Sequence, residues 1–301
     1  MTSPSLRVVI RGVVVAVASV IVGAGASRHL AAQLKTREQA SAQTLPLVRA
    51  FSANADVSMR IFVPAGHVRV RVWKRDSIVI RGTSGKNTTF FGGGSGAGVK
   101  FGVESRSMGA DSLPDADWEV TVPVGAHVWV KMIDGALDVI GTSGEVELYT
   151  VRGVIDVRDV TGVTSIESID APVTVRRANG DVRIRGSKGA VVLDDVRGTL
   201  SVATVSGPVH LSRAHVDGRV ETIGGTIQLS DVSLAGAALE LQSHAGAIEL
   251  TLDPLRAPVL ELSSRAGPVL GPKVIGNAKF GQLSARSFKG RISLHLQAST
   301  R

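Results

Sequence analysis

The chain has 301 residues, a formal net charge of +8 and no cysteine. Disulfide bridges and cysteine-ligated metal sites are therefore excluded, and the positive charge favours anionic partners. Hydrophobic residues make up 44% of the sequence and aromatic residues only 4%, a composition that suits narrow β layers filled by Val, Ile and Leu.

Residues 1–26 have the layout of an export signal. Arg7 and Arg11 precede an apolar run that ends in an Ala-Gly-Ala sequence at residues 24–26. The run is short for a membrane-spanning helix, which needs roughly 20 residues, but it lengthens if the apolar residues before Arg11 join it. We expect either a cleaved signal peptide or a retained inner-membrane anchor helix, with membrane contact through residues 7–26 in the second case. Both alternatives export the rest of the chain to the periplasm or cell surface, because arginines stay inside.

Two segments separate this leader from the regular part of the chain. Residues 27–50 are small and polar, which predicts a linker. Residues 51–133 alternate with period two between turns, which predicts short β-strands of an irregular section that caps the rest. The glycine-rich residues 92–98 lack the spacing and the lysine of a phosphate-binding loop, so we expect a flexible loop there.

The regular part, residues 134–297, is built on a nine-residue repeat. Steps of nine from Gly135 to Gly207 meet glycine at eight of nine positions and Ala171 at the other. Apolar residues stand two and four positions after most of these glycines, as Val182 and Ile184 do. One such unit cannot bury its apolar face alone, whereas stacked units form a continuous core. We predict an all-β fold, a single-stranded parallel β-solenoid (β-helix) with two faces and about 18 residues per coil.

The repeat is similar to that of a group of exported or membrane-linked bacterial proteins. Residues 122–126 (Val-Pro-Val-Gly-Ala) lead into it, and residues 178–184 (Ala-Asn-Gly-Asp-Val-Arg-Ile) and 204–211 (Thr-Val-Ser-Gly-Pro-Val-His-Leu) are representative units. Over residues 51–297 the chain resembles the bacterial "putative adhesin" β-solenoid family. The resemblance implies a β-solenoid of the cell envelope with an adhesin or scaffold role, and it supplies no catalytic residue.

Four arginines of the middle coils, Arg158, Arg176, Arg183 and Arg185, are the candidate binding residues. With 18 residues per coil, Arg158 and Arg176 stack. Such a surface is expected to bind anionic envelope glycans, lipids or an envelope protein; a solvated face without a ligand is the alternative. Nucleic acid is not an expected partner, because exported proteins rarely meet it and aromatic stacking residues are missing.

Catalytic and metal-binding interpretations have less support in the sequence. Asp138 and Asp156 occupy equivalent positions of adjacent coils, as an acid pair would, but solvated surface carboxylates have the same spacing. His210 and His215 lack a third metal ligand, and the glycine-aspartate signature of calcium-binding repeats is absent. We therefore expect no cofactor and a non-enzymatic adhesin or scaffold. A carbohydrate-active β-helix enzyme and a self-assembling, cytoskeleton-like solenoid are the alternatives.

Overall fold

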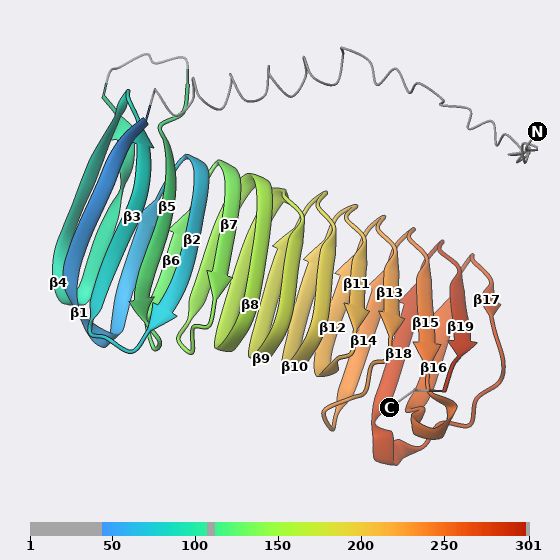
Figure 1. Cartoon of the computed structure of the whole chain (residues 1–301). Helices are drawn as coiled ribbons and strands as arrows, with labels where there is room; N and C mark the ends of the chain where they lie inside the picture. Colours follow the sequence, from blue (N-terminus) through green and yellow to red (C-terminus); the bar gives the residue numbers. More distant parts are fainter. Residues whose placement is uncertain (1–43, 107–111, 299–301) are drawn as a thin grey trace, which may run out of the picture. The chain divides into compact units, whose positions relative to one another are not determined.

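The computed structural model describes residues 44–106 and 112–298, which form a nearly all-β body with one 19-stranded sheet (Figure 1). These residues contain no α-helix and two short 3-10 helices. Within them, no helix has the length and apolar character needed to cross a membrane. The expected signal or anchor helix of residues 1–26 lies outside the described residues.

The strands follow one another along the chain with short connections. The first ten are β1 (Thr44–Phe62), β2 (Ala65–Trp73), β3 (Ser77–Gly85), β4 (Thr88–Ser105), β5 (Asp115–Pro123), β6 (His127–Lys131), β7 (Asp134–Ile140), β8 (Val146–Asp170), β9 (Val173–Gly186) and β10 (Val191–Thr204). The others are β11 (Val209–Ser212), β12 (His215–Thr222), β13 (Ile227–Ser230), β14 (Ala238–Ser243), β15 (Ile248–Leu252), β16 (Val259–Ser264), β17 (Val269–Leu270), β18 (Gln282–Ser287) and β19 (Ile292–Leu296); η1 (Pro254–Arg256) and η2 (Ala278–Phe280) are the 3-10 helices.

Neighbouring coils in the middle of the body pair in parallel at the spacing expected from the repeat. Ile155 of β8 lies opposite Val173 of β9, and Val173 lies opposite Val191 of β10, an offset of 18 residues each time. All three side chains are 0% exposed. The alternation of apolar and polar residues therefore places one side of every strand in a shared core, with a matching residue of the next coil stacked on it.

Each coil contributes to two faces. Face I is the outer surface over β7, β11, β13, β15 and β19, and face II is the outer surface over β6, β12, β14, β18 and β16. The long strands β8, β9 and β10 run over both faces. At the corner from face I to face II, five non-glycine residues adopt positive φ values of 48–56°: Asp159, Arg177, Asp195, Arg213 and Asp231.

Glycine is required at the opposite corner because the coils approach closely there. A Cβ on Gly207 would lie 2.1 Å from the carbonyl oxygen of Gly189, and a Cβ on Gly225 would lie 2.1 Å from that of Gly207. No real Cβ atom tolerates such contact with backbone. The glycine repeat of the sequence thus marks the corners at which one coil rests directly on the next.

The first strands change the direction of pairing. β3 runs antiparallel between β1 and β5, whereas β2 pairs in parallel with β5 and β7. Their core contains aromatic residues: Trp118 is 0% exposed, and its ring lies 5.8 Å from Phe90 and 6.0 Å from Phe101.

Two expectations for this section are corrected by the structure. Residues 44–50, expected to belong to the linker, are the start of β1 and pair with β3, because Leu47 enters the core. The glycine-rich residues 92–98, expected to form a flexible loop, lie within β4. This segment lies against β1, with Gly96 opposite Ala53 and Gly98 opposite Ser58, and a Cβ on Gly94 would lie 2.2 Å from the Gly98 carbonyl oxygen.

The C-terminal coil is inserted rather than added at the end. Leu283 of β18 lies opposite both Leu239 of β14 and Leu260 of β16, and β19 lies between β15 and β17 in the same way. Residues 292–296 are therefore the last strand along the chain but not the end of the stack, since β16 and β17 lie outside them. The glycine corner confirms this order: a Cβ on Gly290 would meet Gly246, and one on Gly267 would meet Gly290.

Candidate functional site

The four predicted arginines do not form one surface. Arg158 and Arg176 are adjacent on face I, as the repeat predicts, whereas Arg183 and Arg185 belong to the second half of β9 and lie on face II. Each has a carboxylate partner. Arg176 contacts Asp156 at 3.4 Å, Arg185 contacts Glu167 at 3.4 Å, and Arg183 contacts Asp181.

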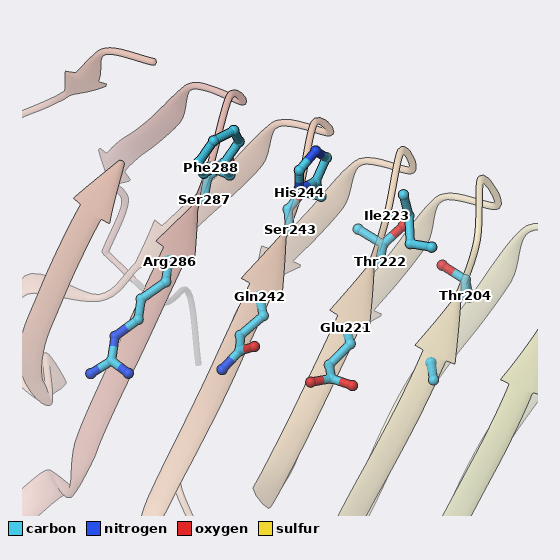
Figure 2. Close-up of a pocket in the computed structure, with 11 residues that line it drawn as sticks. Thr204, Glu221, Thr222, Ile223, Gln242, Ser243, His244, Arg286, Ser287 and Phe288 are labelled. Carbon is cyan, nitrogen blue, oxygen red and sulfur yellow. The ribbon is translucent and has the colours of Figure 1, made fainter. Parts of the chain in front are cut away.

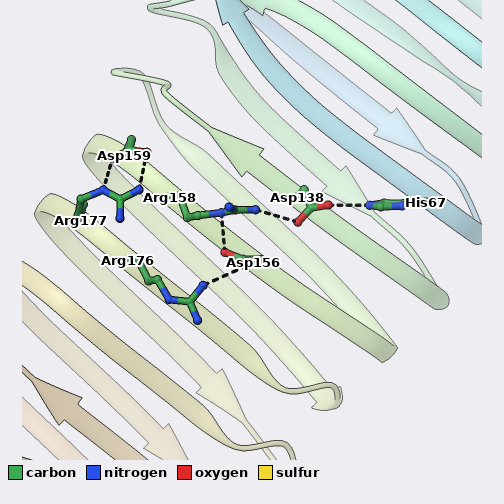
Figure 3. Close-up of polar contacts among 7 residues, drawn as sticks. All are labelled: His67, Asp138, Asp156, Arg158, Asp159, Arg176 and Arg177. Atoms are coloured by element: carbon green, nitrogen blue, oxygen red, sulfur yellow. Dashed lines mark hydrogen bonds and ion pairs between the residues drawn. The ribbon is translucent and has the colours of Figure 1, made fainter. Parts of the chain in front are cut away.

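Face I carries a continuous polar network around the two stacked aspartates (Figure 3). Asp138 lies opposite Asp156 in the pairing of β7 with β8, as the sequence predicts. Arg158 lies 3.8 Å from Asp138 and 3.1 Å from Asp156, and His67 Nε2 lies 2.6 Å from Asp138. The two carboxylates are thus bound to cations, which balances their mutual repulsion.

The bonds around His67 define its tautomer. An Arg69 guanidinium nitrogen lies 2.7 Å from Nδ1 of His67, and guanidinium has only donors. Nδ1 therefore accepts that bond, and Nε2 carries the proton that is donated to Asp138. Both ring nitrogens are engaged, so His67 in this arrangement has no free lone pair for a substrate.

The positive-φ corner carries charges of alternating sign in sequence order, Asp159, Arg177, Asp195, Arg213 and Asp231. Arg177 donates two hydrogen bonds to Asp159, at 2.5 and 2.8 Å. These bonds hold the pKa of Asp159 below its ordinary value of 3.8 and raise the pKa of Arg177. Opposite charges on neighbouring coils support the stacking at this corner.

Glu249 on face I supplies a pH-dependent part of the stability. Arg291 donates to it at 3.0 Å and Gln228 at 2.8 Å, and these bonds lower the pKa of Glu249 below its ordinary value of 4.5. A carboxyl with a lowered pKa contributes stability above its unfolded-state pKa and loses it as the pH falls through the folded-state pKa. Glu249→Gln is therefore expected to lower the free energy of unfolding near neutral pH by less than about 1 kcal/mol and to flatten its decrease below pH 4.5.

Urea denaturation at a series of pH values measures this effect. Glu147→Gln is the control, because Glu147 is exposed on β8 and makes no ion pair or side-chain hydrogen bond with residues 44–106 or 112–298. An equal change of slope in both variants would contradict the assignment to Glu249.

A groove on face II differs from these closed networks. Its volume is about 580 Å³, and its outward side chains Glu221, Gln242 and Arg286 form one row across β12, β14 and β18 (Figure 2). Ala203 and then Arg185 continue the row on β10 and β9. The small side chain of Ala203 leaves space at this end of the groove.

An apolar and aromatic ridge borders the row on the side of the glycine corner. Ile223, His244 and Phe288 follow one another there (Figure 2). The rings of His244 and Phe288 are stacked, with centroids 5.0 Å apart and an interplanar angle of 11°. Arg265 lies over Phe288 at 5.3 Å. Ile223 is 56% exposed and Phe288 is 37% exposed, so apolar surface is available to a ligand.

The hydrogen-bonding groups of the groove divide into two kinds. Hydroxyls of its floor hold the turns: Ser243 donates to the Gly246 carbonyl at 2.7 Å, and Thr204 donates to that of Gly207 at 2.9 Å. In the outward row, Glu221 pairs with Arg219 at 2.5 Å and Arg286 pairs with Glu261 at 2.9 Å, whereas the Gln242 amide has no hydrogen bond within the described residues. The row can therefore bind a ligand, whereas the hydroxyls are structural.

The sequence did not point to this groove. Its strands lie where the nine-residue spacing loosens after Gly207, so that outward positions could not be aligned by counting. His210 and His215 are five residues apart in the sequence, but His210 lies on β11 of face I and His215 on β12 of face II, where it contacts Ser233 at 2.9 Å. Within the described residues, no group of three or more potential His, Asp or Glu ligands surrounds a metal position.

No protein-family model and no curated protein matches the chain. Two solved structures are similar to it. One is a "putative cell adhesion protein" from Clostridium sporogenes ATCC 15579, with 7% identity and a TM-score of 0.25 over 84% of this chain and 100% of that one. The other is a "putative lipid binding protein" from Parabacteroides distasonis ATCC 8503, with 13% identity and a TM-score of 0.40 over 84% of this chain and 95% of that one. Neither likeness is close enough to carry an argument about function.

Proposed function

We propose that the chain is a non-enzymatic β-solenoid of the cell envelope, an adhesin or scaffold module that binds an extended glycan chain along the groove on face II. The 18-residue parallel register supports the solenoid, since like positions stack coil on coil. Export rests on the arginine-flanked apolar leader of the sequence.

One observation carries the binding function. The groove combines a row of polar groups containing the unengaged Gln242 amide with the exposed His244–Phe288 stack. A sugar ring presents C–H groups on its faces and hydroxyls at its edge. An aromatic face covers the former, and amide, carboxylate and guanidinium groups bind the latter. The row crosses successive strands about 4.8 Å apart, so a linear chain meets a polar side chain on each of β12, β14 and β18.

Charge favours an acidic glycan. Arg286 and Arg265 stand at one end of the groove, and the chain has a net charge of +8. The carboxylates of an acidic glycan can bind Arg286 next to Glu261, because guanidinium has five donors. This component of binding weakens as salt rises.

Binding to peptidoglycan fragments, an acidic polysaccharide and anionic liposomes, at low and high salt, tests the proposal. We expect glycan binding that falls about tenfold in Phe288→Ala and in Gln242→Ala, from the loss of roughly 1.4 kcal/mol of contacts. Tyr149→Ala, an aromatic residue of β8 outside the groove, and Arg158→Ala on face I are the controls and should bind as the parent does.

Three results would count against this function. Binding to liposomes alone would indicate a lipid partner. Equal losses of glycan binding in the groove variants and in the controls would exclude the groove as the binding site. No binding to any of the three would leave a scaffold without a glycan ligand.

A further inference from the structure

The outermost coil of the stack leaves core positions without a full set of side chains. On face I, one core position of successive coils is occupied by buried leucines, namely Leu211, Leu229, Leu250 and Leu294. The outermost strand β17 continues this row with Gly271, whose Cβ would lie 2.5 Å from the carbonyl oxygen of Leu294. No side chain of β17 therefore packs on Leu294 at this position.

The same coil is incompletely packed on face II. Leu260 and Leu262 of β16 point to the core side but are only half-buried. Leu239 and Leu241, at the equivalent positions of β14, are 0% exposed. The end of the core is thus apolar on both faces and has no further coil to cover it.

A loop of the chain, residues 271–277, lies across this end and is fixed at its C-terminal side. A Cβ on Gly276 would lie 1.9 Å from the carbonyl oxygen of Pro258, and the Asn277 N–H donates to the carbonyl of Ala257 at 3.0 Å. Val274 packs against the core from the middle of the loop. Because the loop is much shorter than the 18 residues of a full coil, it covers the apolar end only in part.

A cavity of about 570 Å³ remains between the loop and the outermost coil. Four leucines (residues 260, 262, 270 and 294), two valines (residues 269 and 274) and Ile275 supply its apolar lining. Lys273 is the charged residue of the lining, and it makes no ion pair with residues 44–106 or 112–298. Ligand sites in proteins have volumes of about 300–1,000 Å³ and combine an apolar lining with a few polar groups, as this cavity does.

We propose that this cavity binds the hydrocarbon chain of a fatty acid, with the carboxylate at Lys273. Leu270 is 52% exposed and Ile275 is 99% exposed, so a bound chain removes protein apolar surface from water together with its own. The ammonium group of Lys273 carries one positive charge, which matches the single negative charge of a carboxylate. The cavity is thus complementary to a single-chain amphiphile in both polarity and charge.

The fatty-acid site is separate from the groove on face II, since the two share no lining residue. Titration of the full chain with saturated fatty acids from octanoate to octadecanoate, each below its micelle concentration, tests it. The affinity should rise by up to about fourfold with each added CH₂ group and should level off once the hydrocarbon chain fills the cavity. No binding, or a rise without levelling as adsorption to aggregates would give, would overturn the proposal.

Leu270→Glu tests the position of the hydrocarbon chain. The substitution places a carboxylate in the lining of the cavity, so it should lower the affinity for hexadecanoate at least about tenfold. Leu270 is about half exposed, so the variant is expected to fold. Val154→Glu is the matched control, because Val154 is 49% exposed on β8, outside the cavity. Equal affinities of the two variants would overturn the proposal.

Lys273→Gln tests the position of the carboxylate. It should lower the affinity for hexadecanoate about threefold, as expected for an exposed ion pair, and leave the affinity for the uncharged methyl ester unchanged. Lys279→Gln, on η2 and outside the cavity lining, is the control and should change neither affinity. Equal losses for the acid and the ester in Lys273→Gln would contradict an ion pair at this residue and overturn the proposal.

Anionic liposomes distinguish a fatty-acid site from a membrane-binding surface. Association with liposomes by a chain that does not bind the monomeric fatty acids would indicate such a surface and overturn the proposal. These assays contain no glycan, so their failure leaves the proposed function untouched.

Discussion

Gly153→Ala is expected to lower the free energy of unfolding by about 3 kcal/mol or more. Gly153 has a φ of +111°, which L side chains rarely adopt, and a Cβ there would lie 1.7 Å from the carbonyl oxygen of Gly135 on the neighbouring coil. The neighbour is backbone, so it cannot move aside by a change of rotamer. Relief requires the two coils to separate, which breaks ladder hydrogen bonds and exposes the Ile155 core position.

Gly93→Ala is the matched control for this prediction. A Cβ on Gly93 meets nothing within 4 Å, and its φ is not positive. We expect a change within about 0.5 kcal/mol, as for ordinary surface substitutions. Urea denaturation followed by the far-ultraviolet β signal measures both variants. Equal midpoints for Gly153→Ala and the parent would show that the coils do not approach as closely as the structure places them.

Trp118→Ala is expected to cost about 4 kcal/mol, in the range of large-to-small aromatic substitutions in a core. Trp118 is fully buried between Phe90 and Phe101, and its indole N–H donates to Ser84 Oγ at 3.2 Å. The substitution leaves a cavity lined by these rings and an unpaired hydroxyl. Because β3 and β5 pair at this end of the stack, loss of the Trp118 packing should destabilise the whole antiparallel section.

Two variants separate the causes of this effect. Trp118→Phe keeps much of the ring volume but loses the hydrogen bond to Ser84, so it should cost less than the alanine variant. Glu119→Ala, the next residue on β5, points outward and is exposed, so it should change the stability by no more than about 0.5 kcal/mol. A large effect at Glu119 would contradict the inward and outward alternation of β5.

The sequence predicted the regular middle of the molecule well because it is governed by local rules. The nine-residue glycine spacing and the alternation around Val182 and Ile184 anticipated the 18-residue register and the stacking of Arg158 on Arg176. Glycine corners and period-two burial each depend on contacts with an equivalent residue one coil away. Such contacts repeat along the chain and can therefore be counted from the sequence.

The candidate site was less predictable than the strands. Arg183 and Arg185 are near Arg176 in sequence, but the positive-φ corner at Arg177 turns them onto the other face. The carboxylates that engage the four arginines come mostly from a neighbouring coil, as Glu167 does for Arg185. The groove depends on Gln242 and Arg286, which are far apart in sequence and lie side by side only after β18 inserts next to β14.

Composition and periodicity alone determined the β class, the absence of disulfides, the corner glycines and the inward residues of each strand, because these follow from residue type and spacing. Only the tertiary structure determined which strands end the stack and that residues 92–98 form a strand. It also determined that the Gln242 amide, which has no hydrogen bond within the described residues, lies beside the aromatic ridge of His244 and Phe288. Those features depend on the free energy of pairing distant segments: β18 and β19 insert between earlier coils and leave β16 and β17 as the outermost strands. No local pattern encodes such an order of coils, since each strand would be equally amphipathic at any place in the stack.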